Sequence, residues 1–123
     1  MKNKLFSDYR RGMFAEFYAA AFLILKGYSF KAWRYKTPVG EVDLIFKKSG
    51  KIIFVEVKLR PSRDEGMTCI TPKMKSRISR AAQHYMQKSG NKSGGIEVDQ
   101  RFDVVVVSGF RIWHLDNAWF PSP

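Results

Sequence analysis

The first long apolar stretch of the chain predicts a helix. Residues 13–25 (MFAEFYAAAFLIL) are apolar except for Glu16. The helix is expected to begin at about Ser7 or Asp8, which are N-cap candidates, and Gly27 is placed to end it. The stretch is too short to span a bilayer, and its charge argues against export. We therefore expect a buried helix in place of a signal peptide, and no membrane partner.

Extended segments follow. Residues 28–36 (YSFKAWRYK) alternate aromatic with basic side chains, as a half-exposed strand does. These aromatic rings could stack on unpaired bases, but core packing with a basic outer edge is favoured. A turn at 37–40 leads into strands at 41–47 and 51–59. The continuous apolar run at 101–107 (RFDVVVV) is typical of a central strand buried on both faces.

A second helix completes the pattern. Thr71 is expected to cap it, Pro72 to begin it, and Gly90 to follow its end near Lys88. The remaining segments are a polar connection (60–70), a loop (91–95) and a short final strand (111–115). The order helix, three strands, helix, two strands predicts an α/β fold: one domain over residues 1–123, with a mixed central sheet of about five strands flanked by helices.

The turn between the two central strands suggests how they pair. Ser49 and Gly50 are expected at the centre of a two-residue turn, because glycine suits a position that needs positive φ. A bulge would change the register that follows from this turn. One face would then carry the pairs Phe46–Ile53, Leu44–Val55 and Val42–Val57, and the other Ile45–Phe54, Asp43–Glu56 and Glu41–Lys58. The first face is wholly apolar and is expected to pack on a helix.

The opposed pair Asp43 and Glu56 needs an explanation, because like charges directly across a strand pair are destabilising. Lys58 lies on the same face, two residues further on. A divalent cation would explain the pair, since Mg²⁺ takes oxygen ligands, commonly one or two carboxylates with waters and substrate phosphates. Lys58 could then hold or deprotonate a water, or stabilise charge at a phosphate. The alternative is a solvated face on which Lys58 pairs with Glu41 or Glu56.

The charge of the chain favours a polyanionic partner. Lys and Arg total 22 against 11 Asp and Glu, a net charge of +11. Nucleic acid is favoured over a membrane surface, with general solubility as the other explanation. Cys69 is the single cysteine, and no paired Cys or His has zinc-ligand spacing. Nothing in the sequence thus suggests an oxidising compartment, and a cytoplasmic location is expected.

The second predicted helix carries a basic stripe opposite its core positions. The apolar positions at core spacing are Met74, Ile78, Ala81, Ala82 and Tyr85. The basic positions follow one another at spacings of three or four residues: Lys73, Arg77, Arg80, His84 and Lys88. Such stripes bind phosphate backbones, although a solvated face is the usual explanation. The candidate DNA contacts are Lys73, Lys75, Arg77, Arg80 and, after the second central strand, Arg60.

Two motifs in the central strands resemble those of a known family. Asp43, a gap of 12 residues and then Glu56-Val57-Lys58 resembles the signature of PD-(D/E)XK nucleases. Over nearly its whole length the chain resembles the YraN-type family of small bacterial proteins. That resemblance rests on GEVDLI (40–45), FVEVKLR (54–60), Thr71-Pro72, Arg101-Phe102-Asp103-Val104, His114 and Asn117-Ala118.

The resemblance implies a restriction-endonuclease-like core, similar to that of archaeal Holliday-junction resolvases. In such sites an aspartate and a glutamate bind Mg²⁺ or Mn²⁺, a lysine assists the water, and a glutamate of the first helix often joins them. The matching positions are Asp43, Glu56, Lys58 and Glu16. Branched DNA is the implied partner, no small-molecule cofactor is expected, and symmetric cutting of a junction would suggest a homodimer.

Glu16 also stands out by itself, because a buried carboxylate is costly unless it is paired or bound to metal. It could instead lie on the solvent side of its helix or pair with an arginine. Two positions depart from the family pattern: Ala15 stands in place of a glycine, and Met74 where a lysine is usual. Glu41 matches, as a secondary site residue that could anchor Lys58.

Three hypotheses follow from these features. The first is a metal-dependent endonuclease acting on branched or structured DNA. The second is a nucleic-acid-binding module that keeps the nuclease fold without turnover. The third and weakest is a protein-interaction subunit, which would be indifferent to salt and to DNA.

Overall fold

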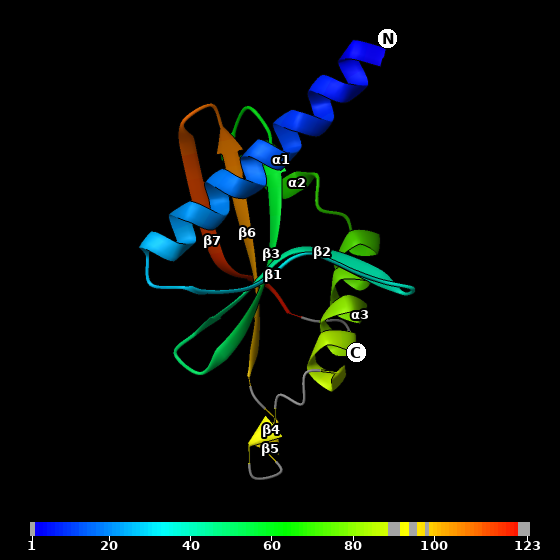
Figure 1. Cartoon of the computed structure of the whole chain (residues 1–123), viewed down its shortest axis with the longest axis vertical. Coiled ribbons are helices and arrows are strands. Elements are labelled where there is room, and N and C mark those ends of the chain that lie inside the picture. Colours follow the sequence, from blue (N-terminus) through cyan, green and yellow to red (C-terminus); the bar gives the residue numbers. More distant parts are fainter. Residues whose placement is uncertain (1, 89–91, 94–95, 98, 121–123) are drawn as a thin grey trace.

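A five-stranded sheet forms the centre of the molecule (Figure 1). The computed structural model describes residues 2–88, 92–93, 96–97 and 99–120, with side chains for 7–88 and 99–120. The strand order is β1-β2-β3-β6-β7, and β3 and β6 are the parallel neighbours. The strands are β1 Ser29–Thr37, β2 Gly40–Lys48, β3 Lys51–Leu59, β6 Gln100–Ser108 and β7 Arg111–Trp119. The mixed α/β sheet predicted from the sequence is thus confirmed.

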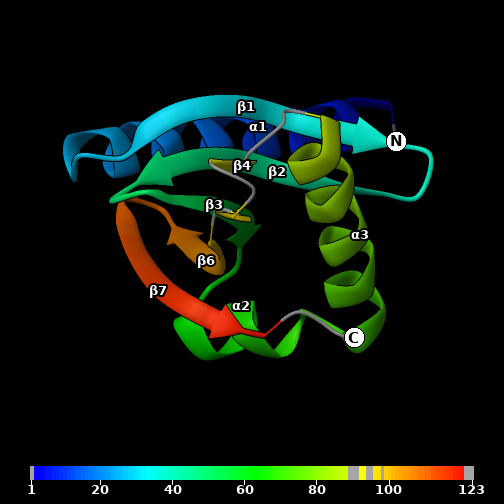
Figure 2. The ribbon, with the colours of Figure 1, turned by 90° about the horizontal axis from the view of Figure 1, so that it is seen from below.

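Helices cover both faces of this sheet (Figure 2). Helix α1, Lys2–Leu25, packs on one face, and α2, Arg63–Thr68, and α3, Pro72–Lys88, pack on the other. Two short strands, β4 (Lys92–Ser93) and β5 (Ile96–Glu97), pair with each other where a loop was expected. Apart from α2 and this pair, the element order is the predicted one, and it is consistent with a nuclease-like core.

Helix α1 differs from the prediction in its start and its burial. It begins at Lys2, so Ser7 and Asp8 are not its N-caps, whereas Gly27, with φ of +93°, follows its end as expected. Ala15, Ala19 and Leu23 pack on the sheet. The expectation of a buried helix was wrong, because the other side of α1 stays exposed. No helix within the described residues is long and apolar enough to cross a membrane.

The segment predicted as a polar connection contains helix α2. The Ser62 hydroxyl accepts a hydrogen bond from the Glu65 backbone N–H at 3.2 Å and caps the helix. This is one of the two hydrogen bonds of a Ser-x-x-Glu capping box. The Ser-x-x-Glu spacing in the sequence was a signal for a helix start. Gly66 packs so closely on Val106 that a Cβ would collide with its side chain. Helix α2 therefore covers the end of β6.

Helix α3 follows the prediction. Thr71 Oγ1 accepts a hydrogen bond from the Met74 N–H at 3.2 Å. Its buried residues are Ile78, Ser79, Ala81, Ala82 and Met86, with Met74 and Tyr85 partly buried against the same core. Gly90 and part of the predicted loop at 91–95 lie outside the described residues.

The β2–β3 hairpin has the predicted register only as far as its middle. Ser49 and Gly50, with φ of +52° and +76°, form the turn. The pairs Phe46–Ile53, Ile45–Phe54 and Leu44–Val55 are confirmed. Regular pairing ends there, and Val42 packs with Ile45 on the α3 side of the sheet, whereas Leu44 packs on the α1 side. The expectation that Val42, Leu44 and Phe46 share one face was therefore wrong.

The neighbouring strand is irregular at the same place. Arg34 of β1 has φ of +52°, which is rare for a residue with a side chain. It sits between Trp33 and Tyr35, whose partners Leu44 and Val42 flank Asp43. The alternation of faces thus breaks in both strands beside Asp43. Such irregularities re-aim side chains and often border functional sites.

The last two strands complete the sheet. Residues 102–107 of β6 are buried, as predicted for a central strand. The final strand was predicted too short: β7 continues beyond Leu115 to Trp119. It pairs antiparallel with β6, and Gly109, with φ of +58°, forms the turn between them.

Candidate active site

A pocket opens where β2 parts from β3. The Asp43 carboxylate accepts a hydrogen bond from the Val57 backbone N–H at 2.9 Å, so a side chain bonds where the regular ladder has ended. The pocket measures about 280 Å³. It is lined by Glu16, Glu41, Asp43, Glu56, Val57 and Lys58, together with Met74, Arg77 and Ile78 of α3. The structure thus brings together all four predicted catalytic residues and Glu41.

Asp43 and Glu56 form the electrostatic centre of this pocket. Burial raises the pKa of Asp43 to about 9, reinforced by the charge of Glu56 and a hydrogen bond between the two carboxyl groups. The bond from the Val57 N–H acts in the opposite direction and does not cancel the rise. The pair therefore retains a proton at neutral pH. A carboxyl group whose pKa is raised by burial and by a neighbouring carboxylate is a recurrent feature of functional sites.

Lys58 lies directly beside this pair. Its Nζ is 3.2 Å from Glu56 Oε2, and both side chains are largely buried. This is the Lys58–Glu56 pairing that the sequence left open, but it lies inside a pocket and not on an open sheet face. The ammonium group is held where it can meet a water or a phosphate oxygen entering the pocket.

Glu16 reaches the pocket already paired. Arg34 donates to both of its carboxylate oxygens, from Nε at 3.0 Å and Nη2 at 3.1 Å, and Trp33 Nε1 donates at 2.8 Å. The hydrogen bond to Glu16 is the main cause that raises the pKa of Arg34. Within the described residues, no three His, Cys, Asp or Glu side chains are grouped to hold one metal ion. Asp43, Glu56 and Glu16 nevertheless line the same pocket.

Gly40 explains how α3 reaches the pocket. A Cβ on Gly40 would collide with the backbone carbonyl of Arg77, so glycine allows the β1–β2 turn to lie against the helix. This contact sets Arg77 at the pocket wall. Of the other predicted DNA contacts, Arg60 borders a neighbouring hollow with Lys58. Lys73 and Arg80 are exposed and Lys75 is half-buried, at other positions of the helix.

Residues 15–107, which include this whole pocket, match the model of a family described as "Uncharacterised protein family UPF0102". The chain belongs to the UPF0102 family. It is 43% identical to a UPF0102 protein of Bradyrhizobium sp. (strain ORS 278), over 94% of this chain and 80% of that relative. It is 40% identical to a UPF0102 protein of Parvibaculum lavamentivorans, over 92% of this chain and 84% of that relative. The YraN-type resemblance read from the sequence is thereby confirmed.

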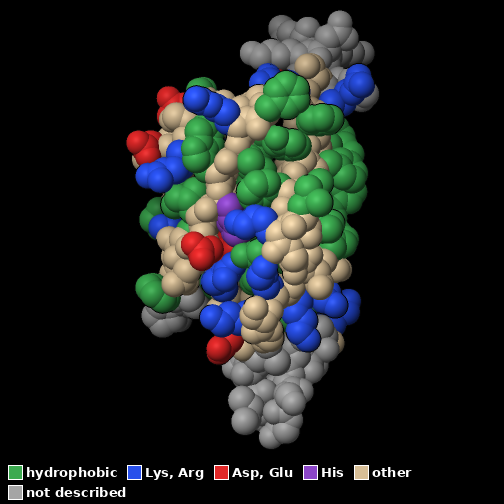
Figure 3. All heavy atoms as spheres, turned by 90° about the vertical axis from the view of Figure 1, so that its left-hand side faces the viewer, with side chains coloured by type: hydrophobic (Ala, Val, Ile, Leu, Met, Phe, Trp, Pro, Cys, Tyr) green, Lys and Arg blue, Asp and Glu red, His purple; other side chains and the backbone are tan. Residues whose placement is uncertain are grey.

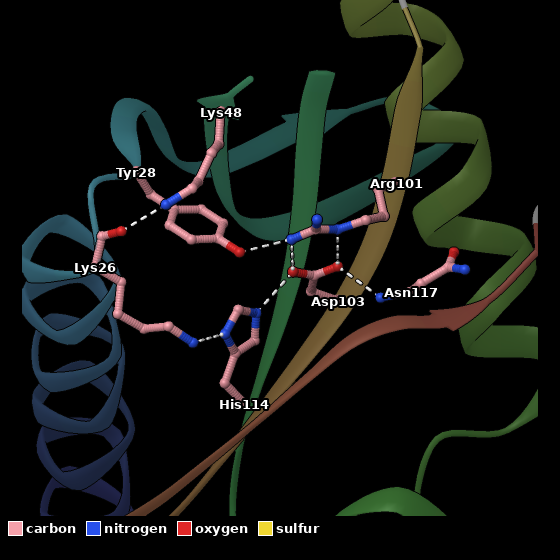
Figure 4. A network of polar contacts seen from close by, with 7 residues as sticks. All are labelled: Lys26, Tyr28, Lys48, Arg101, Asp103, His114 and Asn117. Atoms are coloured by element: carbon pink, nitrogen blue, oxygen red, sulfur yellow. Dashed lines mark hydrogen bonds and ion pairs between the residues drawn. The ribbon is translucent and has the colours of Figure 1, made fainter. Parts of the chain in front are cut away.

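Away from the pocket, the UPF0102 chain holds another buried carboxylate, to which the sequence analysis gave no role (Figure 4). Asp103 is fully buried. Arg101 donates to both of its oxygens at 2.8 and 2.7 Å, and the Asn117 N–H donates at 3.0 Å. His114 Nε2 lies 2.7 Å from Oδ2. A lone aspartate within a buried apolar strand was a signal that such partners exist.

This cluster joins the segment between α1 and β1 to strands β6 and β7 around Asp103 (Figure 4). Arg101 also donates to the Tyr28 hydroxyl at 2.7 Å, and Lys26 Nζ lies 2.7 Å from His114 Nδ1. Burial alone would raise the pKa of Asp103, but the hydrogen bonds from His114 and Arg101 outweigh it and the pKa is lowered. The cluster therefore fastens the end of α1 to β6 and β7 in this UPF0102 protein.

Proposed function

We propose that this UPF0102 protein is a divalent-metal-dependent endonuclease that cuts phosphodiester bonds in branched or otherwise structured DNA. The observation that carries the proposal is the Asp43–Glu56 pair, which shares a pocket with Lys58 and Arg77. Mg²⁺ or Mn²⁺ fits this donor set, because such ions take carboxylate oxygens and would replace the proton that the pair otherwise retains. A DNA substrate would accord with a cytoplasmic location.

Each residue of the pocket has a role in this proposal. Asp43 and Glu56 would hold the ion, which supplies Lewis-acid stabilisation of charge on the phosphate. Lys58 would orient the attacking water or stabilise the phosphate, and Glu56 fixes its ammonium group. Glu16 would become a further ligand once it is released from Arg34. Glu41, at the pocket mouth, would help to hold Asp43 and its neighbours in place.

The basic side chains would hold the DNA around this pocket. Arg77 lies at its wall, and Arg60 lies on the far side of Lys58. Lys73, Lys75 and Arg80 would extend the phosphate contacts along α3. A homodimer would place two such pockets on the two strands of a junction, and the sedimentation of the protein with junction DNA would test that arrangement.

The proposal is tested by cleavage of a labelled four-way junction and a matched linear duplex in Mn²⁺. Wild-type protein should cut the junction, chelator should stop it, and Glu56→Ala should reduce the rate at least a hundredfold, as expected for loss of a metal ligand. Glu65→Ala is the matched control, because it removes an equal charge from an exposed position of α2. Cleavage that persists in Glu56→Ala would refute the assignment.

A second candidate is a nucleic-acid-binding module without turnover. It is favoured by one observation, namely that Arg34 and Trp33 already occupy the Glu16 carboxylate. Such a module would bind DNA with an affinity that falls with log salt, at a slope of about −0.9 per phosphate contacted. Chelator and Glu56→Ala would leave its binding unchanged, and no cleavage would be seen.

A further inference from the structure

The outer side of α1 carries apolar side chains that the fold does not use. Phe14, Phe17, Ile24 and Leu25 are all at least half exposed. Figure 3 shows hydrophobic side chains gathered along the edge of the molecule where α1 lies. Single exposed apolar residues are normal, but a contiguous group marks an interaction surface. The part of this surface nearest the candidate pocket has a composition of its own.

That part is a cluster of three aromatic rings and an arginine: Tyr9, Phe17, Trp33 and Arg34. The Arg34 guanidinium carbon lies 5.1 Å from the ring centroids of both Tyr9 and Trp33. The Phe17 and Trp33 rings are 5.5 Å apart. Tyr9 is 54% exposed, Phe17 59% and Trp33 39%, so these rings remain open to a partner. The four residues come from α1 and β1 and form one surface.

The cluster is joined directly to the pocket. Trp33 and Arg34 donate to the Glu16 carboxylate, and Glu16 lines the pocket with Asp43 and Glu56. Arg34 and Lys36 line an adjoining hollow of about 220 Å³ that also contains Asp43. A nucleotide resting on the cluster would thus leave a neighbouring phosphate within reach of the pocket.

Charge decides which partner fits this surface. The rings are interleaved with cations, since Arg34 lies against two of them and Lys31 and Lys36 are exposed on the same strand. A second copy of a chain with net charge +11 would bring these cations together. Unpaired nucleotides have a stacking face for the rings and a phosphate for the cations. A fully paired duplex buries its base faces and has no such complement.

We propose that Tyr9, Phe17, Trp33 and Arg34 bind unpaired bases, so that the protein acts on DNA in which a single-stranded segment adjoins a duplex. The binding surface stands on the structure alone, whereas its position beside a cleaved phosphate rests on the proposed nuclease function. In that case Arg34 also links the binding surface to the pocket. If Arg34 moved from Glu16 to a substrate phosphate, Glu16 would be released towards the Asp43–Glu56 pair.

The test is equilibrium binding of labelled oligo-dT and of a blunt duplex of equal length, in chelator and at one salt concentration. Phe17→Ala should weaken oligo-dT binding about five- to a hundredfold, the usual effect of removing one stacking partner. Duplex binding should change less than twofold. Tyr9→Ala should act in the same direction. Phe110→Ala, which removes a 90% exposed ring at the β6–β7 turn, is the control and should change neither affinity.

Three results would overturn the inference. The first is an equal loss of affinity for oligo-dT and for the duplex in Phe17→Ala. The second is unchanged oligo-dT binding in that variant. The third is loss of self-association in Phe17→Ala without an effect on DNA binding, which would make the cluster an interface between copies. The assay needs no metal and no cleavage. Selective loss of oligo-dT binding would therefore uphold the surface even in a protein that cuts nothing, and metal-dependent cleavage would stand without it.

Discussion

Two aspartates lie on the strands that flank the central strand β3, and the side chains around them differ in charge. Asp103 of β6 is met by the guanidinium of Arg101, the ring of His114 and the backbone N–H of Asn117. Asp43 of β2 is met by one backbone N–H and by another carboxyl group, that of Glu56. Both lie in one sheet, where Asp103 is fully buried and Asp43 is half-buried. The hydrogen bonds lower the pKa of Asp103, whereas the environment of Asp43 raises its pKa to about 9.

We propose that this difference separates a structural cluster from a functional one. Every oxygen of Asp103 has a donor, so the fold is complete without any addition. At Asp43 the fold holds two acids together at a cost, which is reasonable only where something else completes the site. The first aspartate should therefore matter chiefly for stability and the second chiefly for binding.

The largest effect should come from breaking the complete cluster. Asp103→Ala leaves the Arg101 charge and the His114 ring without their buried partner, which should destabilise the fold by about 3–5 kcal/mol. Urea denaturation measures this loss, and Asp116→Ala, at an exposed position of β7, is the matched control. A loss below about 1 kcal/mol would show that the cluster does not hold the fold together, since ordinary surface changes are smaller than this.

The approach of the β1–β2 turn to α3 should give an intermediate effect. In Gly40→Ala the new methyl group meets the Arg77 carbonyl, so the turn or the helix must move. Such overpacking costs about 1–3 kcal/mol. Thermal unfolding measures it, with Gly12→Ala as control, because a Cβ there meets no atom within 4 Å and alanine favours a helix. An unchanged melting temperature in Gly40→Ala would contradict the close contact.

An effect of the opposite sign should come from Asp43→Asn. At pH values between the ordinary aspartate pKa and about 9, Asp43 is ionised in the unfolded chain but protonated in the folded chain. The folded state therefore loses stability relative to the unfolded state as the pH rises through this range. Asparagine keeps an oxygen for the Val57 N–H and removes the titration. In chelator the variant should match wild type near pH 4 and become steadily more stable than wild type as the pH rises to 8.

Exposed Asp64→Asn provides the control for that pH series. It should track the wild type at every pH. A stability difference between Asp43→Asn and wild type that does not grow between pH 4 and pH 8 would refute the protonated pair.

The sequence predicts most of the sheet, because local signals determine it. The Ser49-Gly50 turn determines the register from Phe46–Ile53 to Leu44–Val55. The same reasoning fails at Val42, because the alternation of faces breaks beside Asp43, opposite Arg34 with its positive φ in β1. The approach of Asp43 to Glu56 was still predicted, since both lie close to where the turn places them.

For long-range partners, the sequence offered an unspecified arginine to Glu16 and no partner to Asp103. The carboxylate of Glu16 belongs to Arg34, and that of Asp103 to Arg101 and His114. No periodicity links Glu16 of α1 to Arg34 of the next strand, β1, because packing decides such contacts. The exposed outer side of α1 was missed for a related reason: an apolar stretch predicts a helix but not how much of it a sheet will cover.

The central claim is that Asp43 and Glu56 hold a cation in place of a proton. Titration calorimetry of Mn²⁺ at pH 7, in two buffers of different ionisation enthalpy and with an uncleavable DNA analogue present, measures both binding and proton release. The account predicts that wild type binds Mn²⁺ and releases about one proton per ion, and that Glu56→Ala does neither. Binding that is equally strong in Glu56→Ala, or the absence of binding in the wild type, would contradict it.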